Sequence, residues 1–234
     1  YRYYSTRQFE PLNTIRYLRA LDMPLEEIAD LLHDRDVDRI EDKLYRQKQA
    51  VADKQRELRR VERKLDDRLR QIRRAQTIPL ELVRREVSPP CRMVWVSTAL
   101  RVQGALDMEG PVRRLERDQG EAVIFLGKVG VGIAPERLNA GHFEEYSGVF
   151  LLLDDEDDYR GPVTCLPQTA CVSLCFRGSH PQAPEQYRRL MDYIRAEGLR
   201  VAGFSREVTL IDYGFTPDPE KFVTEITIPV EEDG

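Results

Sequence analysis

Apolar residues recur at helical spacing in two short series along residues 5–33. The first series follows Ser5 and Gln8, a capping-box pair that marks a helix start. The second follows Pro24 and has Glu26 and Glu27 in its first turn, where acidic side chains favour the positive end of the helix dipole. The apolar members are Phe9, Leu12, Ile15, Leu18 and Leu21, and then Leu25, Ile28, Leu31 and Leu32. The pattern predicts a helix, a tight turn and a second short helix, which alone are too small to bury a core.

A heptad pattern runs through residues 34–76, which no glycine or proline interrupts. One seam position is always apolar and consists of Val37, Leu44, Val51, Leu58, Leu65 and Ile72. The companion position is mixed and consists of Ile40, Gln47, Lys54, Val61, Arg68 and Ala75. The spacing predicts a long helix with a coiled-coil seam, and the polar seam residues are candidates to set its register. The alternative is a solvated helix lying on another domain. We favour a homodimer, because an unpaired helix would leave its apolar row in water.

The remaining chain, residues 80–234, alternates strand-like and helical segments in an order that recurs. The first round is a strand at 91–100, a helix at 108–119, and strands at 121–133 and 146–155. The second is a strand at 168–178, a helix at 183–198, and strands at 201–212 and 221–230. Two such strand–helix–strand–strand units predict an α+β domain with helices on one side of a largely antiparallel sheet.

Composition is consistent with this organisation. The 234 residues are 41% hydrophobic and 33% charged, with a formal net charge of −5. No apolar run reaches the roughly 18 residues that a membrane span needs, and the first residues lack a secretion pattern. The sequence therefore predicts a cytoplasmic protein without a membrane partner.

The four cysteines and three histidines lack the spacing of a metal site. Cys171 and Cys175 lie four positions apart in a predicted strand, so both should point to one face. We expect reduced, packed thiols, no metal and no cofactor. The acidic run at 154–158 is predicted to be a solvated loop, because it lacks the ligand spacing of a calcium loop. No nucleophile–base pair or phosphate loop is recognisable, so the pattern alone does not predict catalysis.

Alternation in the last two strands suggests a site. If residues 206–211 and 223–230 pair as antiparallel neighbours, Glu207 and Glu225 can lie close together on one face. Met93 and Trp95 would share that face. A buried carboxylate is costly unless it is paired, and a cationic, lipophilic ligand among aromatic rings would relieve that cost. The alternative is that both carboxylates simply face solvent.

The stretch YRYYSTRQFEPLNTIRYLRALDMPLEEIADLL resembles the central part of MerR-family transcription regulators. The resemblance covers 1–33 in detail, as the wing end and helix pair of the DNA-binding domain. It covers 34–76 through the heptads, as the dimerisation helix. It implies that Arg2 meets a DNA phosphate with Tyr3 beside it. It also implies that the base-reading helix-turn-helix lies N-terminal to residue 1.

Residues 80–234 resemble the GyrI-like effector domain of multidrug-sensing regulators. The resemblance lies in REVTLID at 206–212 and PEKFVTEITIPV at 219–230. It implies that Glu225 is the inward acidic residue of a ligand pocket. Thr209 stands where the family often has tyrosine. The other candidate pocket residues are Glu207, Trp95, Tyr146, Phe204 and Tyr213, whereas Tyr187 is expected in the core.

Together the resemblances imply a dimeric, ligand-responsive activator that senses amphipathic, cationic molecules. They imply promoter DNA as a partner, and RNA polymerase as an indirect one through distortion of that DNA. Two alternatives remain open: a GyrI-like hydrolase that uses a pocket glutamate as a base, and a module that only sequesters a drug. The fused heptad helix argues against an enzyme.

Overall fold

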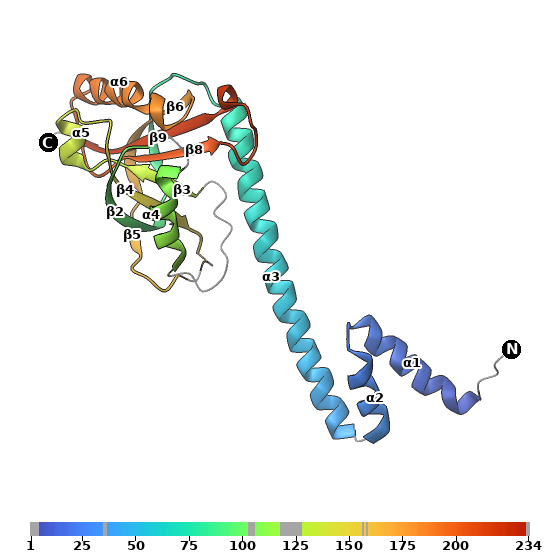
Figure 1. Cartoon of the computed structure of the whole chain (residues 1–234). Helices are drawn as coiled ribbons and strands as arrows, with labels where there is room; N and C mark the ends of the chain where they lie inside the picture. The colour runs from blue at the N-terminus through green and yellow to red at the C-terminus, as the bar shows by residue number, and fades with distance from the viewer. Residues whose placement is uncertain are drawn as a thin grey trace. The chain divides into compact units, whose positions relative to one another are not determined.

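The computed structural model describes residues 5–34, 37–102, 106–117, 128–155, 157 and 159–232. Arg2, Tyr3 and residues 121–127 of one predicted strand lie outside this part. By compactness the chain divides into residues 1–64 and 65–234, which are described separately below (Figure 1). None of the helices within the described ranges is long and apolar enough to cross a membrane.

The first unit contains α1 (Thr6–Ala20), α2 (Leu25–Asp34) and the first part of α3 (Val37–Thr77). The predicted capping box of Ser5 and Gln8 is present at the start of α1. A small core joins the three helices and consists of Leu18, Met23, Ile28 and Leu31, with Ile15, Leu32, Ile40 and Leu44 packed against it. The predicted helix pair and the long helix are therefore both present. The pair α1 and α2 buries its core together with the first part of α3.

Helix α3 is continuous over 41 residues, as the heptads predict. Its apolar row is exposed at Val51, Leu58 and Leu65. The polar seam residue Gln47 donates a hydrogen bond from its amide to the backbone carbonyl of Leu21, which fixes it within its own chain. The exposed row is what a paired helix needs, and the homodimer stays a prediction.

The second unit is built on one sheet with the strand order β1-β6-β9-β8-β3-β4-β2-β5, in which every pairing is antiparallel. The short strand β7 pairs with β9. The strands are β1 (Arg84–Ser88), β2 (Cys91–Leu100), β3 (Val129–Gly132), β4 (Tyr146–Leu153), β5 (Thr164–Leu166), β6 (Thr169–Arg177), β7 (Leu199–Val201), β8 (Arg206–Ile211) and β9 (Val223–Glu232). The helices are α4 (Leu106–Arg117), α5 (Pro135–Asn139) and α6 (Ala183–Ala196), with short turns η1 (His180–Gln182) and η2 (Pro219–Lys221).

The α+β class with its largely antiparallel sheet is confirmed, and the details differ in two ways. The predicted strand at 201–212 is interrupted, so that β7 and β8 are separate strands. The elements β1, β5 and α5 were not predicted, because each is five residues or shorter and carries too few positions for a periodic pattern.

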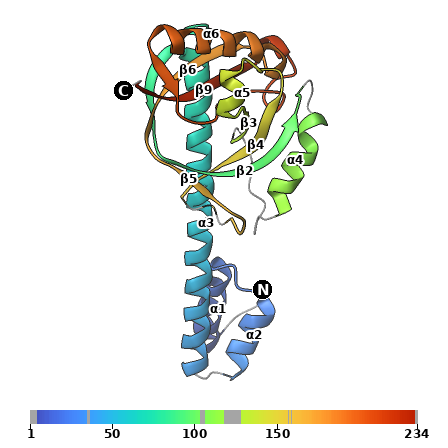
Figure 2. The same ribbon diagram turned by 90° about the vertical axis from the view of Figure 1, so that its left-hand side faces the viewer.

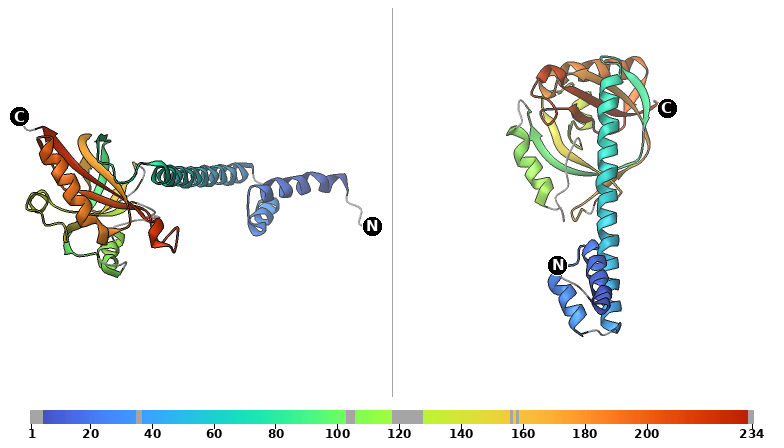
Figure 3. Two further views of the ribbon diagram at one scale, coloured as in Figure 1. Left: turned by 90° about the horizontal axis from the view of Figure 1, so that it is seen from above. Right: turned by 90° about the vertical axis from the view of Figure 1, so that its right-hand side faces the viewer.

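The sheet has two unlike faces. The face that carries Ile226 and Ile228, called here the helix face, packs against Leu190 and Ile194 of α6 and Leu115 of α4. Figures 2 and 3 show α6 running alongside β6 and β9, and α4 beside β2. The opposite face, called here the groove face, carries Val223, against which Ala75 near the end of α3 is buried. The predicted placement of helices on one side holds for α4 and α6.

Candidate ligand-binding site

Glu225 lies on the groove face in the middle of strand β9. It is paired in register with Cys175 of β6 on one side and with Val208 of β8 on the other. Directly paired residues project to the same face of a sheet. The side chain of Glu225 is only 13% exposed, so its carboxylate is largely withdrawn from water.

The carboxylate of Glu225 is paired with an arginine from the end of α3. Arg74 Nη2 lies 2.5 Å from Glu225 Oε1, and Arg84 Nη2 lies 4.0 Å from the same oxygen. The thiol of Cys175 donates to Oε1 at 3.6 Å. Burial raises the pKa of Glu225 above its ordinary value, and Arg74 opposes that rise. Because burial disfavours the ionised form of this carboxylate, a cationic neighbour stabilises that form.

A groove of about 330 Å³ opens beside Glu225. It is lined by Arg74, Glu86, Val87, Ser88, Pro89, Leu152, Cys171, Arg206, Val208, Glu225 and Thr227. Two arginines and two glutamates thus balance in formal charge. Arg206 is fixed, since its Nη2 donates to Ser88 Oγ at 2.6 Å and its Nη1 to Cys91 Sγ at 3.5 Å.

A buried hydroxyl lies on the same face. Ser173 is paired in register with Thr227 of the groove and with Arg84. It is completely buried, and among the residues that the structure describes its Oγ has no hydrogen-bond partner. An unsatisfied buried polar atom is uncommon in folded proteins.

The expectation that Glu207 and Glu225 share a face is wrong. Glu207 is paired with Ile226, and Glu225 with Val208, so the register offsets the two carboxylates by one residue. A shift of one residue moves a side chain to the other face of a sheet. Glu207 therefore lies on the helix face, where it is fully buried.

Glu207 is satisfied there by residues of the core. Tyr146 donates its hydroxyl to the carboxylate at 2.9 and 3.0 Å, and His180 Nδ1 lies 2.6 Å from Oε1. Nearby, the hydroxyls of Tyr187 and Ser205 are 2.9 Å apart. Burial and the adjacent Glu207 raise the pKa of both Tyr146 and Tyr187. Tyr146 thus belongs to an internal polar cluster with Glu207, and Tyr187 is in the core as expected.

Trp95 and Phe204 form an aromatic pair, with ring centroids 4.7 Å apart. Trp95 of β2 is paired with Phe150 of β4, and Phe150 is paired with Gly130 of β3. Because directly paired residues project to the same face, this series places Trp95 on the groove face, as predicted. Glycine at 148 makes this possible, because a Cβ there would overlap the indole ring. Trp95 does not line the groove at Glu225, since four strand spacings of about 4.8 Å separate the two residues.

Tyr213 stands apart from the groove. It is 66% exposed and meets Phe222 edge-on at 4.7 Å. The structure therefore brings Glu225 alone, of the predicted pocket residues, into the groove. Arg74, Glu86 and Arg206 are additional groove residues that sequence reasoning missed.

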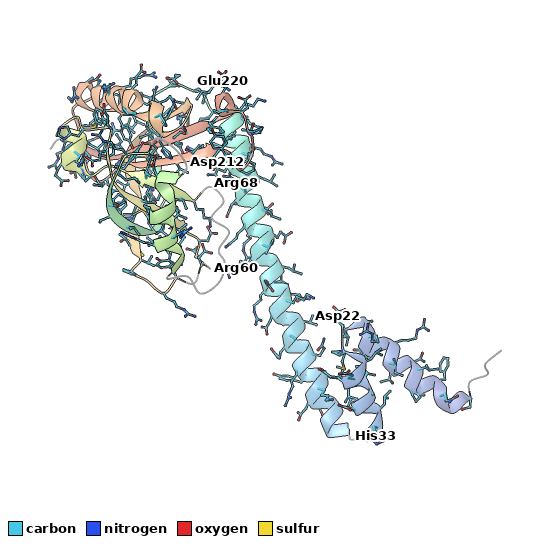
Figure 4. All side chains as sticks on the ribbon, in the orientation of Figure 1. Asp22, His33, Arg60, Arg68, Asp212 and Glu220 are labelled. Atoms are coloured by element: carbon cyan, nitrogen blue, oxygen red, sulfur yellow. The ribbon has the colours of Figure 1, made fainter. Side chains whose placement is uncertain are left out.

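Arg68, a polar residue of the predicted seam, packs within the second unit. It is 7% exposed and its guanidinium lies 4.0 Å from the centre of the Phe215 ring. Burial lowers the pKa of Arg68, and Asp212, which Figure 4 labels near it, opposes that change. Arg68 thus joins the end of α3 to the turn after β8.

Within the described ranges, no group of three or more acidic, histidine or cysteine residues is placed to hold a metal ion. All four cysteines are free thiols, and Cys171 and Cys175 are both buried on the groove face. Burial raises the pKa of Cys175 to about 12, so this thiol stays protonated at neutral pH.

Comparisons with known proteins divide along the chain. Residues 9–67 match the family model described as MerR, DNA binding. The structure of the EcmrR–DNA complex in EcmrR-RPo matches with a TM-score of 0.51 and 16% identity, over 99% of this chain and 86% of that one. This likeness concerns the fold. A search of curated proteins found no match.

Two further structures match the second part of the chain more weakly. The C-terminal domain of EcmrR gives a TM-score of 0.47 and 13% identity, over 64% of this chain and 98% of that one. The crystal structure of a hydrolase from Listeria innocua gives a TM-score of 0.46 and 15% identity, over 68% of this chain and 96% of that one.

The resemblance to the DNA-binding region of MerR-type regulators is thus confirmed over residues 9–67. This region is followed by an α+β domain, and the fold of the chain is similar to that of EcmrR.

Proposed function

We propose that the chain is a ligand-responsive transcription regulator of the MerR type. It forms a homodimer through residues 34–76 and binds promoter DNA as that dimer. Its α+β domain, of the GyrI-like kind, senses an amphipathic cation. Binding of the cation shifts the protein toward a form that distorts the DNA, which affects RNA polymerase indirectly. One observation carries the proposal: the MerR DNA-binding match at 9–67 is joined in one chain to a groove that holds a buried carboxylate.

The chemistry of the groove favours a cation with an apolar body. Glu225 is largely buried, so an ionised carboxylate there is stabilised by a positive group that excludes water. Val87, Val208 and Leu152 supply apolar surface beside it. A ligand can shift the regulator only if it binds its two states unequally.

The ligand site is tested with a matched pair of probes. Naphthylmethyl trimethylammonium carries a fixed positive charge, and neopentylnaphthalene is its neutral isostere. We expect the protein to bind the cation more tightly, measured by isothermal titration calorimetry. The variant Glu225→Gln should lose affinity for the cation on the order of 30-fold, about 2 kcal/mol, and should bind the isostere unchanged.

The control is Glu231→Gln, which removes a carboxylate from an exposed position of the same strand. It should bind both probes as the wild type does. Equal binding of the two probes by the wild type, or unchanged cation binding by Glu225→Gln, would contradict the proposed site. Turnover of reactive electrophiles that Glu225→Gln abolishes would instead favour the hydrolase alternative.

A further inference from the structure

The lining of the groove contains two carboxylates, Glu86 and Glu225, and two arginines, Arg74 and Arg206. Within the described residues, both carboxylates have Arg74 as a neighbour. Arg74 Nη2 lies 2.5 Å from Glu225 Oε1 and 3.8 Å from Glu86 Oε1. A cationic ligand that pairs with Glu225 must therefore replace a cation that is already present.

Of the arginines near Glu225, Arg74 has the side chain that can most easily move away from the carboxylate. Its side chain is 48% exposed, and its two carboxylate contacts lie on the groove side. Arg84 is only 20% exposed and is also held by Pro79 O at 3.3 Å. Arg206 is fixed by Ser88 and Cys91 and makes no ion pair with Glu225 within the described residues.

The backbone at Arg74 does not have to move for the side chain to leave. The next residue, Ala75, is 4% exposed and packs with Leu210 and Val223. Apolar contact therefore holds the end of α3 on the sheet, whereas the ion pair of Arg74 is an additional link between α3 and β9. Loss of the ion pair would leave α3 attached to the second unit by the apolar contacts of Ala75 and by the packing of Arg68 on Phe215.

We propose that Arg74 is a tethered counterion that occupies the cation subsite of Glu225 in the unliganded protein, and that the effector cation displaces it. This inference rests on the proposed function. It identifies the ion pair between α3 and β9 as the contact that ligand binding breaks. Because α3 begins within the matched DNA-binding region, occupancy of the groove changes how the helix of that region is held at its other end.

If Arg74 and the ligand compete for the Glu225 carboxylate, the direction of the change in cation affinity on replacing Arg74 can be predicted. Removing the competitor must strengthen binding of the cation, because the ligand no longer has to break the ion pair. Arg74→Gln should therefore bind naphthylmethyl trimethylammonium about tenfold more tightly than the wild type. It should bind neopentylnaphthalene unchanged. Arg74→Lys keeps a positive charge at this place and should restore affinity toward the wild-type value.

The matched control is Arg73→Gln, which removes the same charge from the preceding exposed residue. It should leave cation binding nearly unchanged, since its effect is only long-range and is screened by salt. The double variant Arg74→Gln with Glu225→Gln should show no gain over Glu225→Gln alone. Circular dichroism on each variant establishes that it is folded.

The outcomes separate this inference from the proposed function. If the wild type binds the cation through Glu225, but Arg74→Gln binds it equally or more weakly, the hypothesis that Arg74 competes with the ligand is wrong. The proposed ligand site at Glu225 is then still supported. An equal gain in Arg73→Gln and Arg74→Gln would also overturn it. If neither the wild type nor Arg74→Gln prefers the cation over its isostere, the proposed function itself fails.

Discussion

At the scale of single residues, what the sequence could reveal was chemical type, and what it could not reveal was partners. Glu225 was recognisable as an acid within an apolar strand. Its partner Arg74 was not, because the two residues lie 151 positions apart in sequence and Arg74 lies in a run of basic helix residues. Nothing in the local pattern distinguishes Arg74 from its neighbour Arg73.

The raised pKa of Glu225 predicts how stability depends on pH. In the unfolded chain a glutamate titrates near a pKa of about 4.3. Burial moves the folded-state pKa of Glu225 above that value, so the folded state holds its proton to higher pH. The contribution of this group to stability is therefore full below a pH of about 4.3, and it is lost as the pH rises through the folded-state pKa.

Urea unfolding at a series of pH values tests this sign by comparing the wild type with Glu225→Gln. The free energy of unfolding of the wild type, relative to the variant, should fall as the pH rises through the folded-state pKa. A relative stability that increases with pH over that interval would mean that the carboxylate is stabilised in its ionised form, contrary to the burial described here.

At the scale of elements, periodicity predicted most segments, whereas register was beyond its reach. The long helix, α6 and the strands β2, β4, β6 and β9 follow directly from spacing. Alternation along β8 and β9 also identified which residues of each strand share a face. Only the pairing between the strands decides which faces coincide, and a one-residue offset separates Glu207 from Glu225.

Buried Tyr146 and exposed Tyr213 should respond differently to the loss of the hydroxyl. Tyr146 donates to buried Glu207 on the helix face, so Tyr146→Phe leaves a carboxylate oxygen without that donor. We expect a loss of about 1–3 kcal/mol in the free energy of unfolding. Binding of naphthylmethyl trimethylammonium should not change, because Tyr146 is not on the groove face.

Tyr213→Phe serves as the control, since Tyr213 is 66% exposed and its stability should change by less than about 0.5 kcal/mol. Urea unfolding and calorimetry on both variants measure the two effects. If Tyr146→Phe kept its stability but lost cation binding, the ligand would bind on the helix face and not on the groove face, contrary to this prediction.

At the scale of the whole molecule, the heptad row predicts self-association. Val51, Leu58 and Leu65 are exposed along α3, and a row of this kind is normally covered by a second helix. Two other seam residues, Gln47 and Arg68, have partners within their own chain, so they have roles besides any register across a dimer.

Sedimentation equilibrium tests the dimer. The wild type should sediment as a dimer, and Leu58→Asp should weaken association by at least about 100-fold, because symmetry places two charges in an apolar seam. Arg59→Asp adds the same side chain outside the seam and should remain dimeric. A monomeric wild type at micromolar concentration, or two variants with equal association, would contradict the assignment of residues 34–76.

The position of a bound cation in a crystal structure tests whether Glu225 binds the ligand and whether Arg74 is displaced. We predict that a crystal structure with naphthylmethyl trimethylammonium will place the ammonium against the Glu225 carboxylate, in the groove formed with Glu86 and Val208, and that the Arg74 guanidinium will have moved away from Glu225. A cation bound beside Glu207 on the helix face, or anywhere that leaves Glu225 without contact to it, would contradict the account.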